Sequence, residues 1–130
     1  MLNLRDIEVF KPYADEVPEA MLVDAGGDDR CVTTWLEAAT LRVAKLDAEV
    51  LGCYAMDRLS TFEFRLHGVV VVPTRRKQGL GRWLTGHAIG VAESKGGRQV
   101  SLPQVGSSRC FQHIGFVRRE QDWVFDLIQE

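Results

Sequence analysis

The chain has 130 residues, of which 45% are hydrophobic and 26% charged, with 12 Gly and 4 Pro. These figures predict one domain over residues 1–130 and exclude collagen-like, low-complexity and disordered chains. No apolar run approaches the roughly 18 residues of a membrane span, and charged residues interrupt the N-terminal segment where a secretion signal would be apolar. We therefore expect a cytoplasmic protein with no membrane partner.

Charge is divided unevenly along the chain. Residues 1–63 carry six Lys and Arg against 13 Asp and Glu, or −7, whereas residues 64–130 carry ten against five, or +5, which gives −2 in total. A basic half in an acidic chain favours a single anionic ligand over a nucleic acid, because the whole domain weakly repels a phosphate backbone. An unevenly charged, solvated surface explains the same count.

The cysteines indicate no crosslink and no metal. Cys31, Cys53 and Cys110 are odd in number and lack a CxxC spacing, so neither a disulfide framework nor a zinc site is expected. We expect reduced thiols.

The first half of the chain predicts a strand, two helices and a hairpin. A strand is expected over Leu4–Phe10 and a helix over Tyr13–Val23, where apolar residues have helical spacing. Asp28 or Asp29 can cap a second helix that runs to Ala39. From Leu41 the apolar period changes to two, so a hairpin with a turn at residues 47–49 follows.

The second half predicts a central strand followed by an amphipathic helix. Alternation from Phe62 gives way to the run Val69–Val72, which is typical of a strand entering the middle of a sheet. Pro73 ends it, and a helix with an apolar stripe runs from Leu80 to Val91. Gly86 and Gly90 would let that helix approach the sheet closely, and His87, like His113, is expected on a helix surface.

The chain is expected to end in short elements. Gln99–Leu102 is predicted as a strand, Ser107–Ile114 as a short helix, and Phe116–Arg119 with Trp123–Ile128 as a final hairpin. No repeat or linker interrupts this order.

The segment from Val69 to Arg82 has the features of an anion-binding loop. It joins a buried strand to a helix start through a basic stretch and two glycines, Gly79 and Gly81. The first N–H groups of a helix lack partners and lie at the positive end of its dipole. Glycine lets a ligand approach the backbone, and arginine can grip a phosphate with two hydrogen bonds. A diphosphate fits such a loop.

Two common nucleotide motifs fit poorly. The Walker pattern needs four residues between its glycines and then Lys-Ser/Thr, and the dinucleotide fingerprint needs a third glycine where Leu84 stands. The stretch Arg76-Lys-Gln-Gly79-Leu-Gly81 instead resembles the acyl-CoA signature of the GNAT superfamily of N-acyltransferases. The remaining alternative is an unrelated α/β domain with a similar anion-binding loop.

The resemblance to GNAT proteins covers nearly the whole chain. The predicted order of elements is that of the superfamily, and Phe111-Gln-His-Ile-Gly115-Phe116 falls where members carry a Tyr-x-x-x-Gly-Phe element. It implies an α/β (α+β) fold with a mixed, mostly antiparallel sheet of six to seven strands, flanked by helices, whose fourth and fifth strands splay apart.

The resemblance also implies where acetyl-CoA binds. Val70, Val71 and Val72 would line the pantetheine arm along the splayed strand. The loop would receive the diphosphate, and the short helix would line the other side of the cofactor. The implied cofactor-binding residues outside the strand are Arg76, Lys77, Gln78, Gly79, Leu80, Gly81, Arg82, Ser107, Ser108 and Phe111. For Arg82 a solvated helix terminus explains the residue equally well.

Catalysis in similar proteins is direct attack of an amine on the thioester, which needs a proton acceptor. The acceptor is commonly a Glu six residues before the strand-ending proline, and His67 holds that place here. An imidazole can accept a proton near neutral pH. Glu63 on the same predicted strand face is the second choice. A lone histidine on a strand is often merely structural, which is the alternative to a catalytic role for His67.

The proton donor of the family is missing. Phe111 replaces the tyrosine that would protonate the leaving thiolate, and Gln104 stands where an Asn often precedes it. Cys110 and Ser108 lie nearby, although each is better explained as a small buried residue.

Two functions follow from these expectations. The first is an acetyl-CoA-dependent N-acetyltransferase acting on a small-molecule or protein amine, with a homodimer left open. The alternative is a non-catalytic acyl-CoA-binding regulator that docks on a partner protein. Acidic residues between Asp15 and Asp29 fall in the segment that walls the acceptor pocket in similar proteins, where they would attract a cationic amine or form a solvated helix face.

Overall fold

The computed structural model describes residues 3–24, 28–76, 78–103, 116–119 and 122–127. Its helices and strands are η1 (Leu4–Asp6), β1 (Glu8–Phe10), η2 (Ala14–Glu16), α1 (Glu19–Asp24), α2 (Asp29–Leu36), β2 (Thr40–Leu46), β3 (Glu49–Arg58), β4 (Glu63–Val71), η3 (Pro73–Arg75), α3 (Leu80–Ser94), β5 (Gln99–Pro103), β6 (Val117–Arg119) and β7 (Asp122–Asp126). The predicted short helix at Ser107–Ile114 lies outside the described residues.

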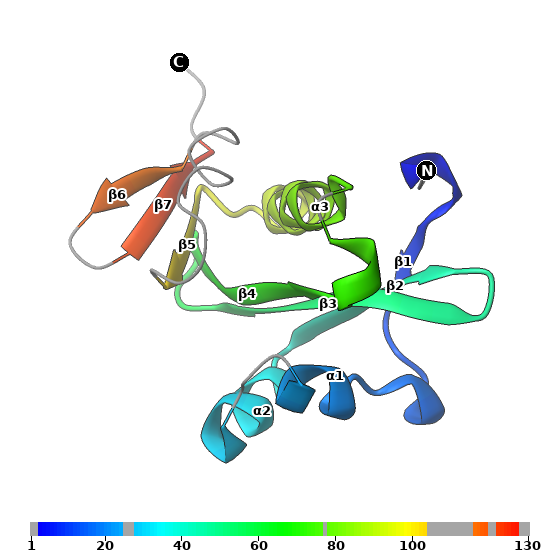
Figure 1. The fold of residues 1–130 in the computed structure, drawn as a ribbon. Coiled ribbons are helices and arrows are strands. Elements are labelled where there is room, and N and C mark those ends of the chain that lie inside the picture. The colour runs from blue at the N-terminus through cyan, green and yellow to red at the C-terminus, as the bar shows by residue number, and fades with distance from the viewer. Residues whose placement is uncertain (1–2, 25–27, 77, 104–115, 120–121, 128–130) are drawn as a thin grey trace.

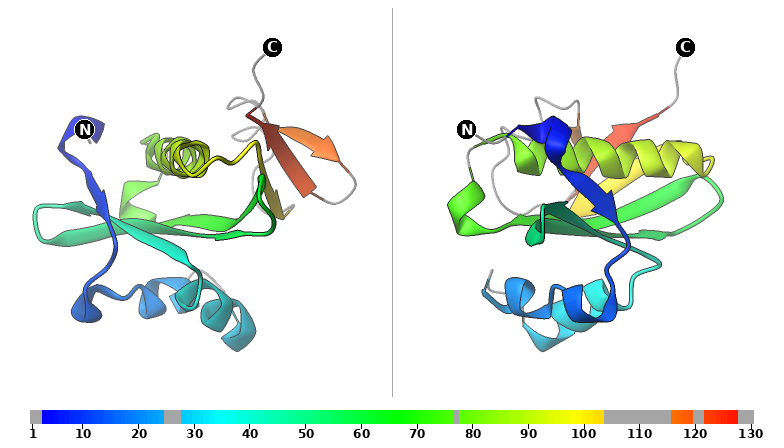
Figure 2. Two further views of the ribbon diagram at one scale, coloured as in Figure 1. Left: turned by 180° about the vertical axis from the view of Figure 1, so that it is seen from behind. Right: turned by 90° about the vertical axis from the view of Figure 1, so that its right-hand side faces the viewer.

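One seven-stranded sheet organises the fold, in the order β1-β2-β3-β4-β5-β7-β6. All neighbouring strands are antiparallel except β4 and β5, which are parallel. The helices α1 and α2 cover one face of the sheet and α3 covers the other (Figures 1 and 2). The predicted mixed, mostly antiparallel α+β fold is therefore confirmed. In the described part of the chain, no helix is long and apolar enough to cross a membrane.

A separate hydrophobic core fills the space on each side of the sheet. The larger core, under α3, includes Leu66, Leu80 and Leu84, all at most 1% exposed. The smaller core, under α1 and α2, contains Trp35 and the free thiol Cys53. Burial raises the pKa of Cys53 to about 12, which makes this thiol a packing residue rather than a nucleophile.

The N-terminal predictions were partly wrong. The expected strand over Leu4–Phe10 begins only at Glu8, because residues 4–6 form a 3-10 turn that the side chain of Asn3 caps at Arg5 N. The expected helix over Tyr13–Val23 is interrupted at Pro18, which lacks an N–H and keeps the preceding residue extended. The predicted cap of the second helix is confirmed, since Asp28 accepts from Cys31 N at 2.8 Å.

The prediction for the glycines of α3 was also wrong. Gly86 and Gly90 are exposed, and a Cβ on either would meet no atom within 4 Å. They lie on the outer face of α3 rather than against the sheet. The side that packs on the sheet carries Leu84, Thr85 and Ala88 instead.

His87 is not an ordinary surface residue of α3. Its Nδ1 lies 2.8 Å from the hydroxyl of Tyr54, a fully buried side chain of β3, and its ring packs near Trp83. Burial and the charge of Arg42 lower the pKa of His87. Burial raises the pKa of Tyr54 to about 12. The pair is therefore neutral in the folded protein.

This pair predicts acid sensitivity of folding. Because the pKa of His87 is lowered in the folded state, the unfolded chain takes up a proton first as the pH falls below 6.5. We expect the free energy of unfolding, measured by urea titration, to fall between about pH 7 and 5.5, and His87→Gln to flatten that slope. Glu16 contributes little to this slope, because its pKa is lowered from 4.5, so its stabilisation is present above that pH and is lost mainly below it. An unchanged slope in the variant would contradict the prediction.

Candidate active site

The sheet opens between β4 and β5. Three pairs join these strands, Glu63 with Gln99, Phe64 with Val100 and Arg65 with Ser101, and no further pair follows within the described residues. β4 continues for six residues beyond Arg65, to Val71. The predicted splay of the fourth and fifth strands is therefore present, and among the described residues the edge of β4 beyond Arg65 has no strand beside it.

A β-bulge lies in β4 just past the point of separation. Ala55 of β3 pairs with Gly68 and Met56 pairs with Leu66, so His67 is the extra residue without a cross-strand partner. The backbone of Gly68 has φ +155°, and a Cβ there would come within 2.7 Å of the Trp35 ring. A glycine inside an alternating strand is the signal that indicates such a bulge.

His67 is held by a carboxylate of the neighbouring strand. Its Nε2 lies 2.9 Å from Oδ2 of Asp57 on β3, and its side chain is 19% exposed. The other carboxylate oxygen of Asp57 accepts from the backbone N–H of Ala39, between α2 and β2, at 2.8 Å. The imidazole therefore has a fixed partner and partial access to solvent.

Glu63 occupies a different place from His67. It begins β4, is exposed, and accepts a hydrogen bond from the Ser60 hydroxyl at 3.1 Å. Four residues of strand, about 13 Å at 3.3 Å per residue, separate it from His67. Between them, Arg65 pairs with Asp122 of β7 at 3.1 Å. The structure thus places His67 beside the opening, and Glu63 at the closed end.

The edge of β4 and the following loop form one cavity. Val72 N–H donates to Leu51 of β3, so the peptide groups of Val71 point away from β3, since successive residues alternate. The Val71 carbonyl accepts from Arg76 Nε at 3.0 Å. A cavity of about 200 Å³ here is lined by Met21, Asp24, Val70, Val71, Val72, Pro73 and Arg76.

The cavity brings together four residues that the sequence indicated, Val70, Val71, Val72 and Arg76. Sequence reasoning missed Met21 and named Asp24 only as one of the acidic residues of the acceptor-pocket segment; α1 supplies both to this cavity. Their helical spacing was visible, but no local pattern shows which helix faces this edge of the sheet.

The start of α3 leaves its first N–H groups free of a side-chain cap. Gly79 is the N-cap residue with φ 85°, a left-handed conformation that favours glycine. Leu80 is 1% exposed and anchors the helix in the core, so only its backbone can contact a ligand. A Cβ on Gly81 would lie 3.8 Å from the Val71 side chain. These features keep the helix N-terminus close to the edge of β4.

The other loop residues are more dispersed. Gln78 is exposed and donates a long hydrogen bond of 3.4 Å to the Thr74 carbonyl. Arg82 and Gly79 border a separate groove of about 530 Å³ on the outer side of α3, together with Leu4, Trp83, Gly86 and His87. Several predicted residues lie outside the described residues: Lys77, Gln104, Ser107, Ser108, Cys110, Phe111 and His113.

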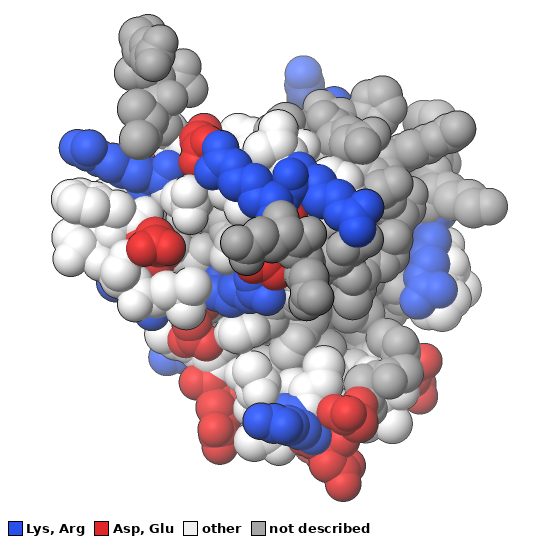
Figure 3. All heavy atoms as spheres, turned by 90° about the vertical axis from the view of Figure 1, so that its left-hand side faces the viewer, with Lys and Arg blue, Asp and Glu red and all other residues white. Residues whose placement is uncertain are grey.

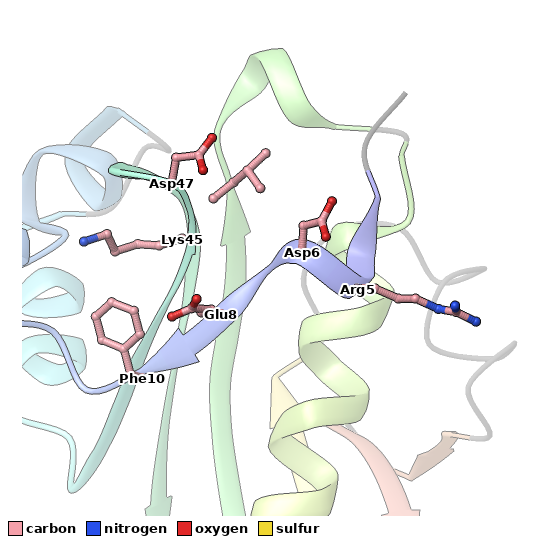
Figure 4. Close-up of a pocket in the computed structure, with 7 residues that line it drawn as sticks. Arg5, Asp6, Glu8, Phe10, Lys45 and Asp47 are labelled. Carbon is pink, nitrogen blue, oxygen red and sulfur yellow. The ribbon is translucent and has the colours of Figure 1, made fainter.

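Another hollow, of about 560 Å³, lies at the β1 edge of the sheet (Figure 4). Its charges are mixed in sign, and Lys45 is already paired with Glu16 and lies over the Phe10 ring. β2 and β3 separate β1 from β4, so the hollow is distinct from the cavity along β4. Its lining residues are Arg5, Asp6, Glu8, Phe10, Lys45, Leu46 and Asp47.

The helical layer opposite α3 is strongly acidic. Residues 13–37 carry seven Asp and Glu against one Arg. On the face shown in Figure 3, acidic side chains gather at the lower end, where α1 and α2 lie, and basic side chains lie mainly above. Asp57 and the imidazole of His67 lie on this side of the sheet, beside the junction of α2 and β2.

The sequence matches a model of the Acetyltransferase (GNAT) family over residues 4–116. A comparison with curated protein sequences found no match.

Solved structures of similar fold agree with the family match. A GNAT family acetyltransferase from Elizabethkingia anophelis, with acetyl-CoA bound, is 22% identical with a TM-score of 0.79 over 88% of this chain and 78% of its own. The ribosomal-protein-S18-alanine N-acetyltransferase from Escherichia coli is 15% identical, with a TM-score of 0.78 over 95% and 96%. N-acetylglutamate synthase from Neisseria gonorrhoeae, complexed with coenzyme A and N-acetyl-glutamate, is 14% identical. Its TM-score is 0.78, and the match covers 95% of this chain and 35% of the synthase chain. At these identities the likeness establishes the fold.

The bulge beside His67 predicts a strong effect of adding one methyl group. In Gly68→Ala the new Cβ would meet the Trp35 ring at 2.7 Å with φ at +155°, which we expect to destabilise the fold by about 1–3 kcal/mol. Gly90→Ala is the matched control: no atom lies within 4 Å, and a better helix former should stabilise α3 by up to about 1 kcal/mol. Urea titration measures both. Equal stabilities of Gly68→Ala and the parent would show that Trp35 does not contact Gly68.

Proposed function

The chain belongs to the GNAT acetyltransferase family, and from that premise we propose that it is an N-acetyltransferase that transfers an acetyl group from acetyl-CoA to a primary amine. The observation that carries the proposal is the open edge of β4, which leads from the uncapped start of α3 to the imidazole of His67. An anion site and a proton acceptor then lie at two places along one strand.

The residues around the cavity are suited to hold coenzyme A. Unpaired N–H groups at the start of α3 and the guanidinium of Arg76 would receive the diphosphate. The peptide groups of Val71 would pair with the amides of the pantetheine arm once Arg76 turns from the Val71 carbonyl to the phosphates. Lys77, Gln78 and Arg82 would add charge and hydrogen bonds around the loop, and Ser107, Ser108 and Phe111 would close the other side.

The reaction needs one proton acceptor. The amine nitrogen attacks the thioester carbonyl, the new C–N bond replaces the C–S bond, and coenzyme A leaves as its thiolate. The ammonium group loses two protons on the way to the amide. His67 takes the first, directly or through a water molecule, which frees the nitrogen lone pair for attack. The second leaves the nitrogen for solvent after the C–N bond has formed. Its place beside the opening of the sheet favours it over Glu63, which lies at the closed end and is bonded to Ser60.

Protonation of the leaving thiolate needs less help from the protein than removal of a proton from the amine. Thiols have pKa values only slightly above neutrality, about 8.5 for cysteine, so a thiolate can leave without a dedicated acid. Tyr54 cannot replace the absent family tyrosine, since it is buried on the far side of the sheet and bonded to His87. We propose that Phe111 packs against the cofactor and that the thiolate takes its proton from solvent.

The acceptor that we propose is a cationic amine, small or part of a protein. The acidic layer of residues 13–37, with Asp24 in the cavity wall, attracts such a substrate. Amine acceptors of both sizes occur in the fold, as the names of the S18-alanine N-acetyltransferase and the N-acetylglutamate synthase state. We further propose that residues 1–130 act as one domain in the cytoplasm.

Arg76 provides a test of cofactor binding. In Arg76→Ala, loss of a charged hydrogen-bond donor to the diphosphate should weaken acetyl-CoA binding about tenfold in calorimetry. Binding of S-acetylpantetheine, which lacks the diphosphate, should not change. Arg98→Ala is the control, because Arg98 lies over Phe62 beyond the opposite end of α3. Equal loss for both ligands would place Arg76 away from the diphosphate.

His67 provides the test of catalysis. We expect the parent protein to release free coenzyme A from acetyl-CoA with at least one amine of a panel of spermidine, L-glutamate and a peptide with N-terminal alanine. His67→Ala should lower kcat about 100-fold or more, with acetyl-CoA affinity retained. Acetyl-CoA binding without release by any amine would instead support the alternative, an acyl-CoA-binding regulator.

A further inference from the structure

We infer that Asp57 is a positioning residue that fixes the tautomer of His67, so that Nδ1 is the nitrogen that receives the substrate proton. The inference rests on the proposed function only for its catalytic consequence. The arrangement itself, a carboxylate on β3 shared between an imidazole and a backbone amide, stands on the geometry of the described residues.

Both carboxylate oxygens of Asp57 take part in hydrogen bonds. Oδ1 accepts from the N–H of Ala39 at 2.8 Å, and Oδ2 lies 2.9 Å from His67 Nε2. A backbone N–H can only donate, so the first contact fixes which oxygen faces the histidine. The carboxylate is thereby held between the end of α2 and the bulge of β4.

An ionised carboxylate can only accept hydrogen bonds. The neutral imidazole must therefore carry its proton on Nε2 to donate to Asp57, and Nδ1 is left with its lone pair. When Nδ1 takes up the substrate proton, the resulting imidazolium lies next to a negative charge that stabilises it. The same logic holds wherever a carboxylate orients a histidine base.

The bulge explains why this contact involves His67. As the extra residue of β4, His67 has no residue opposite it on β3, and its ring reaches across to Asp57, which pairs with Arg65 in the ladder. The side chain of Asp57 is 35% exposed and that of His67 is 19% exposed. Both side chains are therefore partly open to solvent, as a proton acceptor for an incoming amine must be.

Asp57→Asn tests the inference with almost no change of shape. The carboxamide has one oxygen, which the fixed N–H of Ala39 retains, and its NH₂ group then faces Nε2 and can only donate. His67 must accept at Nε2 and carry its proton on Nδ1, the wrong tautomer for a base at that position. The effect is specific to hydrogen-bond polarity, and a merely structural role would not produce it.

The first readout is ¹⁵N NMR of the imidazole, assigned by its loss in His67→Ala and recorded well above the pH range in which imidazoles titrate. We expect the Nε2–H tautomer in the parent protein and the Nδ1–H tautomer in Asp57→Asn. This readout needs neither acetyl-CoA nor an acceptor. The same tautomer in both proteins would overturn the inference, even if acetyl transfer is confirmed.

The second readout is steady-state kinetics with acetyl-CoA and the amine of the panel that the parent uses. We expect kcat of Asp57→Asn to fall about 100-fold, with KM for acetyl-CoA unchanged, since the variant alters only the proton acceptor. Asp126→Asn, which removes an exposed ion pair with Arg119, is the matched control and should keep the parental kcat. An unchanged kcat in Asp57→Asn would overturn the catalytic role while leaving the proposed acetyltransferase intact.

If the parent protein acetylates no amine, the proposed function fails, and the NMR result alone decides whether Asp57 fixes His67. If Asp57→Asn unfolds at lower urea than Asp126→Asn, circular dichroism gives the folded fraction, and the NMR spectrum of that fraction still reports the tautomer. A folded variant with an Nδ1–H imidazole supports the inference, and a folded variant with Nε2–H contradicts it.

Discussion

The separation of β4 from β5 is the constraint on which the rest of the structure depends. Backbone N–H and C=O groups in a sheet normally find partners on both sides. Here, in the part of the chain that the structure describes, the ladder stops at Arg65 and Ser101 although β4 continues to Val71. The polar groups of that edge need partners from elsewhere, and Arg76 supplies one to the Val71 carbonyl. An extended ligand with its own amides would find partners along the same edge, which is the basis of the cofactor site that we propose.

The two faces of the sheet carry different kinds of side chain. The face under α3 holds most of the buried apolar side chains, and its polar pair of Tyr54 and His87 is neutral and internally bonded. The face under α1 and α2 is less fully covered and carries His67, Asp57 and the acidic layer. The larger core on one side therefore packs against β4, while the other side carries the titratable groups of the proposed catalytic site.

Local sequence patterns predicted the elements that depend on neighbours along the chain. The Val-rich strand, the cap at Asp28 and the loop before α3 were all visible, because propensity and hydrogen bonds within a few residues decide them. The contacts that involve distant residues were not visible. His87 was expected on a surface because its partner, Tyr54, is 33 positions away. Met21 was missed, and Asp24 was not expected beside β4, for the same reason: only the packing of α1 brings them there.

The pairing of His67 with Asp57 shows how one local irregularity, the bulge in β4, produces a contact between residues that are distant in the sequence. Gly68 permits the bulge because a side chain there would meet Trp35. The bulge frees His67 from cross-strand pairing, and the frame of β3 brings Asp57 within 2.9 Å of its ring. The bend also lies just past the last pair between β4 and β5. Gly68 thus places the imidazole of His67 where the sheet opens. In the sequence alone, a glycine at this position would be expected only to weaken the strand.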